Sequence, residues 1–459
     1  MKLTFYGGAR MVTGANYLLE SADVKILIDC GLHQGSSFCE ALNWEPFPYK
    51  PSEIQAVFLT HAHIDHIGRL PKLWKDGFRG KIYSTPPTKD FAELLLLDSE
   101  HILREEAKEK NKPPLYGTSD VIETMKLWRK VSYHEKIRIG SPGSELEISF
   151  YDAGHILGSS SILISAGQSN GGKKIVFSGD LGNSPAPFIK PTEYFENADY
   201  VLIESAYGGR FHEDLTERKA VLEDLIEETV RGKGVLLIPA FALERTQEMI
   251  FELNELAENG RIPSAPIFID SPLAIKLTTL YQKYSAEPDY FNAAAIKQIR
   301  SGDAIFNFPG LKMTLTTEES KAINEVPPPK IIVAGAGMSN GGRILHHERR
   351  YLSDPKTTIL FIGYQAVGSL GRRIMEGAKT VKIFGDEIPV RAKIKAIGGF
   401  SAHADQPQLL KWLEPMRGHL KKVFVIQGEE EQSLALAQKI KDELAIEAIT
   451  PSIGETVVL

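Results

Sequence analysis

The chain has 459 residues. A chain of this length is too long for a single ordinary hydrophobic core, so two domains are expected. Hydrophobic residues make up 42% and charged residues 24%, which is typical of a soluble globular protein, and no apolar stretch is long enough for a membrane span or a signal peptide. The 2 cysteines, Cys30 and Cys39, form no disulfide framework and indicate a reducing, cytoplasmic location. The net charge of −6 excludes a positive field over the whole protein that would attract nucleic acid. A nucleic-acid partner would therefore have to be held by a local basic cleft or by metals.

Short predicted strands with polar residues at their carboxyl ends fill the first part of the chain. Apolar runs predict strands over 25–28, 56–59, 148–151, 174–177 and 200–204. Four of them end at or near a potential ligand: Asp29, His155, Asp180 and Glu204. A single one of these residues would also suit a plain structural role, such as a core histidine for His155 or a turn aspartate for Asp29 and Asp180. The repetition predicts instead that they share one edge of the fold.

The densest group of potential ligands directly follows the strand predicted at 56–59. His61, His63, Asp65 and His66 fall within six positions, and imidazole and carboxylate groups suit Zn²⁺ and similar ions. Side chains two apart in an extended loop point the same way, so His61 and His63 can bind one ion. Asp65 and His66 come where the chain turns into a helix and point elsewhere. The spacing therefore favours two adjacent metal sites, an arrangement used to hydrolyse phosphodiesters.

Strands and helices alternate from about residue 206 onwards. Strands are predicted over 235–238, 266–269, 330–334 and 358–362, and helices over 244–258 and from about 274. Such alternation predicts a parallel sheet with helices on its faces. The tail returns to strand-like runs at 423–426 and 456–459. We expect one domain formed by 1–206 and 386–459 and a second, inserted α/β domain at 207–385.

The ordered set His61, His63, Asp65, His66, His155 and Asp180 resembles the motifs of the metallo-β-lactamase fold. The insertion after Glu204 and the segment from Phe400 to Asp405 narrow the resemblance to the β-CASP group of nucleic-acid-processing enzymes. That group includes RNase J and the endonuclease subunit of the pre-mRNA 3′-end cleavage machinery, and the chain is most similar to its short bacterial and archaeal members. The resemblance covers essentially the whole chain and implies an αββα sandwich with an inserted β-CASP domain.

The resemblance also implies a role for each matching residue. It places His61, His63, His155 and Asp180 on one zinc ion, with Asp65, His66 and the bridging Asp180 on a second. Glu204 matches an acidic motif beside the metals, and Ser401 and His403 are similar to residues that hold the scissile phosphate. Asp29 is expected to orient a ligand histidine through its ring N–H. Apart from the resemblance, the glycine-rich turn that ends at Arg343 is either a structural turn or a phosphate-binding loop, to which Arg343 would add charge for RNA.

The chain departs from the family pattern at Gln427. Members of the family usually have a histidine there that binds the second metal, in a Val-His-Gly-Glu context, whereas this chain reads Ile426-Gln427-Gly428-Glu429. A neutral amide oxygen is a poorer zinc ligand than imidazole. We therefore expect a weaker second site, or one filled only with substrate or by a harder ion such as Mn²⁺.

The first functional hypothesis is a zinc-dependent ribonuclease that hydrolyses single-stranded RNA by two-metal activation of water, with Asp65, Glu204 and His403 taking part in catalysis. The second is a non-catalytic RNA-binding scaffold subunit, which Gln427 favours. The third is a small-molecule metallohydrolase such as a thioesterase or lactonase, which would need neither the insertion nor the Ser401/His403 motif. Cleavage within or from the end of an RNA, activity on DNA, and a homo-oligomeric state stay open.

Overall fold

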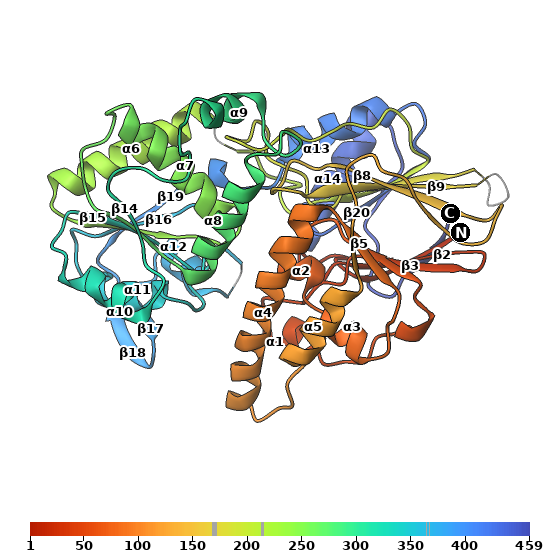
Figure 1. Cartoon of the computed structure of the whole chain (residues 1–459), viewed down its shortest axis with the longest axis horizontal. Helices are drawn as coiled ribbons and strands as arrows, with labels where there is room; N and C mark the ends of the chain where they lie inside the picture. Colours follow the sequence, from red (N-terminus) through yellow and green to blue (C-terminus); the bar gives the residue numbers. More distant parts are fainter. Residues whose placement is uncertain (168–171, 213–214, 364, 367) are drawn as a thin grey trace. The chain divides into compact units, whose positions relative to one another are not determined.

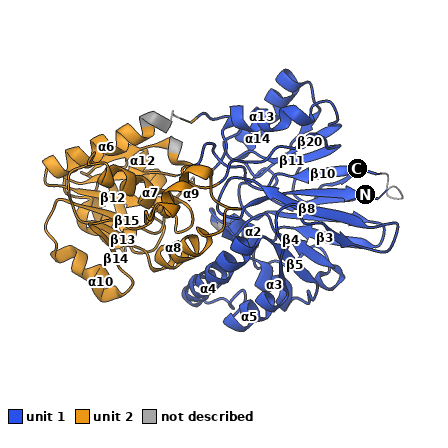
Figure 2. Ribbon diagram, turned by 45° about the horizontal axis from the view of Figure 1, so that its top comes forward, with its two compact units in different colours: residues 1–186, 190–211, 403–459 blue, residues 187–189, 212–402 orange. Residues whose placement is uncertain are grey.

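The computed structural model describes residues 1–167, 172–212, 215–363, 365–366 and 368–459. The chain forms two compact units, which Figure 2 shows in blue and orange. The first contains residues 1–186, 190–211 and 403–459, and the second contains 187–189 and 212–402. Neither α4 (Pro86–Glu109), with its 24 residues, nor any other helix in the described part of the chain is long and apolar enough to cross a membrane.

Two seven-stranded sheets form the centre of the first unit. In one of these sheets, the first strand of the chain pairs with the last strand, which brings the two ends of the chain together (Figure 1). The order in that sheet is β22 (Thr456–Val458), β1 (Lys2–Gly7), β2 (Asn16–Ser21), β3 (Val24–Ile28), β4 (Ala56–Phe58), β5 (Lys81–Ser84) and β6 (Trp128–Lys130). The order in the other is β21 (Ala448–Ile449), β20 (Lys422–Ile426), β11 (Tyr200–Glu204), β10 (Lys174–Phe177), β9 (Ser160–Ala166), β8 (Leu146–Asp152) and β7 (Ile137–Ile139).

Alternating side chains of the strands build three apolar layers in this unit. In β3, Ile26 and Ile28 lie in the core between the two sheets, whereas Leu27 packs into the cluster under the helices on the outer face. In β10, Ile175 faces the core between the sheets and Val176 faces the opposite outer cluster. Because both faces of each sheet are covered, central strands such as β4 and β10 are mainly apolar. The helices are α1 (Ser37–Ala41), α2 (Ile64–Ile67), α3 (Leu70–Lys75), α4, α5 (Thr118–Lys126), α13 (Gln406–Leu413) and α14 (Glu430–Lys439).

These layers give the αββα sandwich of the metallo-β-lactamase fold, as the sequence predicts. Figure 1 shows α3, α4 and α5 on one side of the paired sheets and α13 and α14 on the other. Strands β3, β4 and β5 run parallel to one another, as do β10, β11 and β20. Their carboxyl ends therefore deliver the following loops to a shared edge of each sheet, where ligands gather in open α/β sheets.

The second unit is a three-layer α/β domain around a six-stranded parallel sheet, which confirms the predicted alternation. The strand order is β14 (Leu311–Met313), β13 (Ile267–Asp270), β15 (Lys330–Ala334), β12 (Val235–Pro239), β16 (Thr358–Phe361) and β19 (Lys393–Ala396). A hairpin of β17 (Thr380–Ile383) and β18 (Asp386–Pro389) stands beside it. The helices are α6 (Leu215–Arg231), α7 (Arg245–Glu258), α8 (Pro272–Tyr284), α9 (Ala293–Arg300), α10 (Thr317–Ala322), α11 (Ile344–Tyr351) and α12 (Leu370–Met375).

Candidate metal centre

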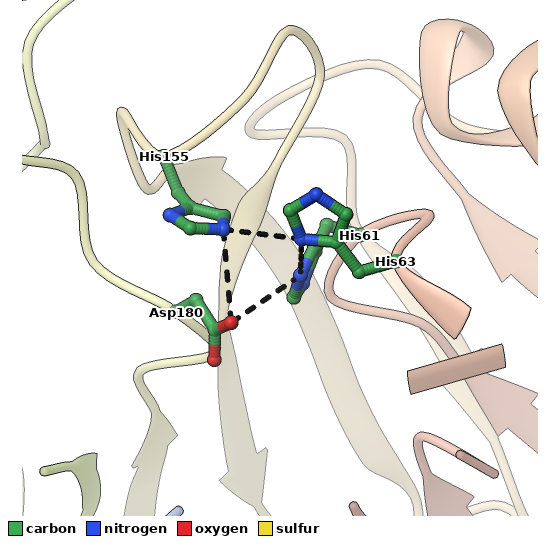
Figure 3. Close-up of side chains that lie close together, drawn as sticks. All are labelled: His61, His63, His155 and Asp180. Carbon is green, nitrogen blue, oxygen red and sulfur yellow. Dashed lines mark hydrogen bonds and ion pairs between the residues drawn. The ribbon is translucent and has the colours of Figure 1, made fainter. Parts of the chain in front are cut away.

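Four side chains from three loops of the first unit converge on one point. His61 and His63 follow β4, His155 lies between β8 and β9, and Asp180 follows β10. One ligand atom of each lies within 4.8 Å of the others, and Figure 3 shows the four side chains turned toward one another. His61, His155 and Asp180 are almost fully buried. These are the residues that the resemblance assigns to a first zinc ion.

Neighbouring ligand atoms of this group are separated by distances close to those around a single zinc ion. His63 Nδ1 lies 3.0 Å from His61 Nε2 and 3.2 Å from His155 Nε2. Asp180 Oδ2 lies 3.4 Å from His61 Nε2 and 3.7 Å from His155 Nε2. Zinc bonds of about 2.0–2.1 Å in a tetrahedron separate the ligand atoms by about 3.3 Å. The observed spacings of 3.0–3.7 Å therefore fit one zinc-sized ion held by three imidazoles and a carboxylate.

Asp29 and Thr60 hold the histidine side chains of the site in place through hydrogen bonds. The Asp29 carboxylate accepts hydrogen bonds of 2.8 Å from both the backbone N–H and the hydroxyl of Thr60, and it contacts His66 Nδ1 at 2.7 Å. The Thr60 hydroxyl in turn lies 3.1 Å from His61 Nδ1, which leaves Nε2 of that ring facing Asp180. Sequence reasoning expected Asp29 to orient a histidine, but it gave Thr60 no role. A threonine between an apolar run and the first histidine does not by itself indicate a role at a metal site.

Glu204 and His403 form a second group with Asp180. The Glu204 carboxylate lies 3.1 Å and 3.2 Å from His403 Nδ1 and accepts a 2.7 Å hydrogen bond from Leu181 N–H. His403 is brought here because its backbone bridges to Gly182 and the following Ala404 N–H donates to Leu181 O. Burial would lower the pKa of His403, but the Glu204 carboxylate, helped by Asp180, raises it to about 9. The ring is therefore an imidazolium cation near neutral pH.

Asp65 and His66 lie on α2, beside the first group. In the described part of the chain, neither residue belongs to a group of three or more close ligand atoms. His66 Nε2 lies 3.4 Å from Asp180 Oδ1 and 3.9 Å from Asp65 Oδ2. Burial raises the pKa of the Asp65 carboxyl to about 6. Gln427, directly after β20, is also present, with its side-chain nitrogen 2.8 Å from His66 Nε2 and 2.9 Å from Asp180 Oδ1.

Tyr17 is a further polar side chain near this site that the sequence did not single out. Its hydroxyl is buried and has no hydrogen-bond partner among the described residues. Burial, together with the carboxylates of Asp29, Asp180 and Asp65, holds the pKa of Tyr17 well above its usual range. A tyrosine inside an apolar strand reads as core, so the sequence offers no sign of this placement.

The remaining two predicted residues belong to the second unit. Ser401 is buried and its N–H donates to Gly398 O at 2.9 Å. Arg343 donates to Asp270 Oδ1 at 2.7 Å and to the backbone oxygens of Thr314 and Leu315 at 2.9 Å. The guanidinium charge of Arg343 is thus paired with a buried carboxylate.

Comparison with known proteins places this geometry in a family. Residues 18–195 match a metallo-beta-lactamase superfamily domain, 246–374 a Beta-Casp domain, and 387–451 a Zn-dependent metallo-hydrolase RNA specificity domain. The chain is 39% identical over 440 residues to Ribonuclease TTHA0252 from Thermus thermophilus, covering 95% of both proteins. It is 32% identical over 471 residues to the transcription termination factor FttA from Methanosarcina mazei, covering 100% of this chain and 71% of that protein.

A solved structure shares the fold at low identity. A protein of unknown function from Enterococcus faecalis aligns over 100% of this chain and 99% of its own, with a TM-score of 0.54 and 12% identity. The domain matches and the ribonuclease relative together support a hydrolase with a metallo-hydrolase fold. The chain belongs to the β-CASP family of the metallo-β-lactamase superfamily.

Proposed function

We propose that this protein is a zinc-dependent ribonuclease that hydrolyses phosphodiester bonds of single-stranded RNA in the cytoplasm. The observation that carries the proposal is the convergence of ligand atoms of His61, His63, His155 and Asp180 on one point, with the Glu204–His403 pair beside Asp180. The RNA specificity domain that matches 387–451 and the ribonuclease relative support RNA as the substrate.

The chain's own residues have distinct tasks in this proposal. An ion held by the four ligands would activate water as a nucleophile near neutral pH. The Asp29–Thr60 pair fixes the orientation of His61, so that the ligand set is preorganised. His403, kept as an imidazolium by Glu204, would stabilise negative charge on the phosphate, and Asp65 would carry a proton away. Ser401, two residues before His403, remains our prediction for a further phosphate contact.

The test is cleavage of an end-labelled single-stranded RNA by purified protein with added zinc. We expect cleavage by the wild type, loss of cleavage in His63→Ala, and unchanged cleavage in His419→Ala, because His419 is exposed and lies outside the ligand set. A single-stranded DNA and a thioester, assayed in parallel, separate a ribonuclease from a broader nuclease and from a small-molecule hydrolase. Cleavage that survives in His63→Ala would refute the proposal.

A non-catalytic RNA-binding scaffold is the second candidate, and Gln427 is the observation that favours it. A scaffold would bind the labelled RNA without cutting it, with zinc or with Mn²⁺. A mobility-shift assay under the same conditions distinguishes the two candidates, since the ribonuclease must turn the bound RNA into shorter products.

A further inference from the structure

Gln427 occupies a tightly held position beside the metal centre. It follows β20, which pairs in parallel with β11, and the residue is only 3% exposed. Its backbone has φ +48, in the left-handed region that non-glycine residues seldom adopt, and its N–H donates to Gly8 O at 2.6 Å. Gly8 lies directly against the Gln427 side chain, since a Cβ at Gly8 would lie 3.1 Å from Gln427 Cγ. The side chain is therefore directed into the site by its backbone.

The Gln427 amide makes two contacts that match its two N–H groups. Nε2 lies 2.9 Å from Asp180 Oδ1 and 2.8 Å from His66 Nε2. In the neutral tautomer of His66 that donates through Nδ1 to Asp29, at 2.7 Å, Nε2 is an acceptor for the second amide N–H. The reversed amide would place Oε1 against the Asp180 carboxylate oxygen, with two acceptors facing each other. With His66 in this neutral tautomer, the hydrogen-bond network favours the orientation in which the amide nitrogen faces both partners.

These two contacts use the lone pairs that a second metal ion would need. Asp180 Oδ1 and His66 Nε2 lie 3.4 Å apart, the spacing of two ligands on one zinc ion. An imidazole Nε2 has one lone pair, so it either accepts an N–H or binds a metal. A second ion therefore requires the amide to leave at least His66, whereas Asp180 Oδ1 has a further lone pair. Reversing it to offer Oε1 would supply only a neutral oxygen, which is a poor zinc ligand.

We propose that this chain binds a single metal ion, at His61, His63, His155 and Asp180, and that the Gln427 amide closes the second position. The amide N–H dipoles point at Asp180 and His66 and supply part of the positive charge that the ion would bring there. The inference rests on the proposed function only in taking those four residues as a metal site. It differs from the two-metal arrangement expected from the family pattern, and replaces the expectation of a weak second site with that of a closed one.

The test is the zinc content of the wild type and Gln427→His, each loaded with excess zinc, desalted, and measured by native mass spectrometry. We expect one zinc per chain for the wild type and two for Gln427→His, which supplies an imidazole in place of the amide. Gln438→His, an exposed position on α14, is the matched control and should hold one zinc. His63→Ala should hold none, which assigns the counted ion to the four-ligand site.

X-ray absorption at the zinc edge gives a second readout that does not depend on activity. Two ions in one site lie about 3.5–4 Å apart and scatter from each other. We expect that signal in Gln427→His and not in the wild type. Two zinc ions per wild-type chain with that signal, or none at all, would overturn the inference, even if Gln427→His did not fold. One zinc without RNA cleavage would leave the inference standing and refute the ribonuclease proposal instead.

Discussion

The Asp29 carboxylate binds Thr60 twice, at its backbone N–H and at its hydroxyl, both at 2.8 Å. Asp29 directly follows β3 and has φ +59, and Thr60 immediately precedes the first histidine of the metal centre. These hydrogen bonds link the carboxyl ends of two neighbouring parallel strands, β3 and β4, next to the first metal-ligand histidine. The hydrogen bonds between Asp29 and Thr60 therefore tie the position of His61 to the ends of these two strands.

Asp29→Asn should weaken zinc binding. The amide offers one acceptor oxygen in place of two, so either the Thr60 N–H loses its acceptor or the Thr60 hydroxyl and the His66 ring lose theirs. Changes to groups that orient metal ligands typically lower affinity about 10–100-fold. Competition with a chromophoric chelator measures the zinc affinity, and Asp224→Asn, at an exposed position on α6, should leave it unchanged. Equal affinities for wild type and Asp29→Asn would show that the carboxylate does not orient the ligands.

Gly31→Ala should destabilise the loop that carries the histidines. A Cβ at Gly31 would lie 1.5 Å from Asp65 O, and that oxygen cannot withdraw freely because it accepts a 2.9 Å hydrogen bond from Ala15 N–H. We expect a loss of about 3 kcal/mol or more in the free energy of unfolding. Urea unfolding checks this, with Gly418→Ala as the control, since a Cβ there meets nothing within 4 Å. A wild-type midpoint for Gly31→Ala would contradict the packing described.

His403→Gln should lower kcat without removing the metal. The imidazolium beside Glu204 lies outside the four-ligand group, so the zinc content should stay at the wild-type value. Loss of a positioned acid or charge-stabilising group commonly costs about 10²–10⁴ in rate. RNA cleavage kinetics combined with a zinc count test this, with His419→Gln as the matched substitution. A parallel fall in zinc content would instead assign His403 to metal binding.

Glu348→Gln should make the stability of the protein less dependent on pH between about pH 4 and pH 8. Glu348 is fully buried on α11, its Oε1 accepts from the Ser339 hydroxyl at 2.5 Å, and burial raises its pKa to about 8. In the unfolded chain the pKa is about 4.3, so between about pH 4 and 8 only the folded state keeps the proton. Stability is therefore full at low pH and falls by about 1.4 kcal/mol per pH unit as the pH rises through that window.

The neutral glutamine does not titrate, so its advantage over the wild type should grow between pH 5 and pH 8. Thermal unfolding at several pH values provides the measurement. Glu431→Gln, at an exposed position on α14, should follow the wild-type curve at every pH. Curves for Glu348→Gln and the wild type that stay parallel from pH 5 to pH 8 would mean that the carboxyl is not held protonated.

Much of the fold was accessible from local patterns. The apolar runs at β3, β4, β8, β10, β11 and β20 are strands, and the alternation after residue 206 is a parallel sheet with helices. These elements are buried on both faces over most of their length, so their sequences are mainly apolar and stand out from the turns. The ligands at the strand ends were equally visible, because histidine and aspartate directly after a buried strand are costly unless they find partners.

By itself, the sequence determined the ligand types, their order and the departure at Gln427, since those are properties of single positions and their neighbours. Only the tertiary structure decided which atoms meet: that Thr60 links Asp29 to His61, and that the Gln427 amide, 361 residues from His66 along the chain, lies against its ring. Hydrogen bonds depend on separations of a few tenths of an ångström and on direction. Such precision comes from the packing of β3, β4, β10 and β20 into the sandwich, and no local pattern contains it.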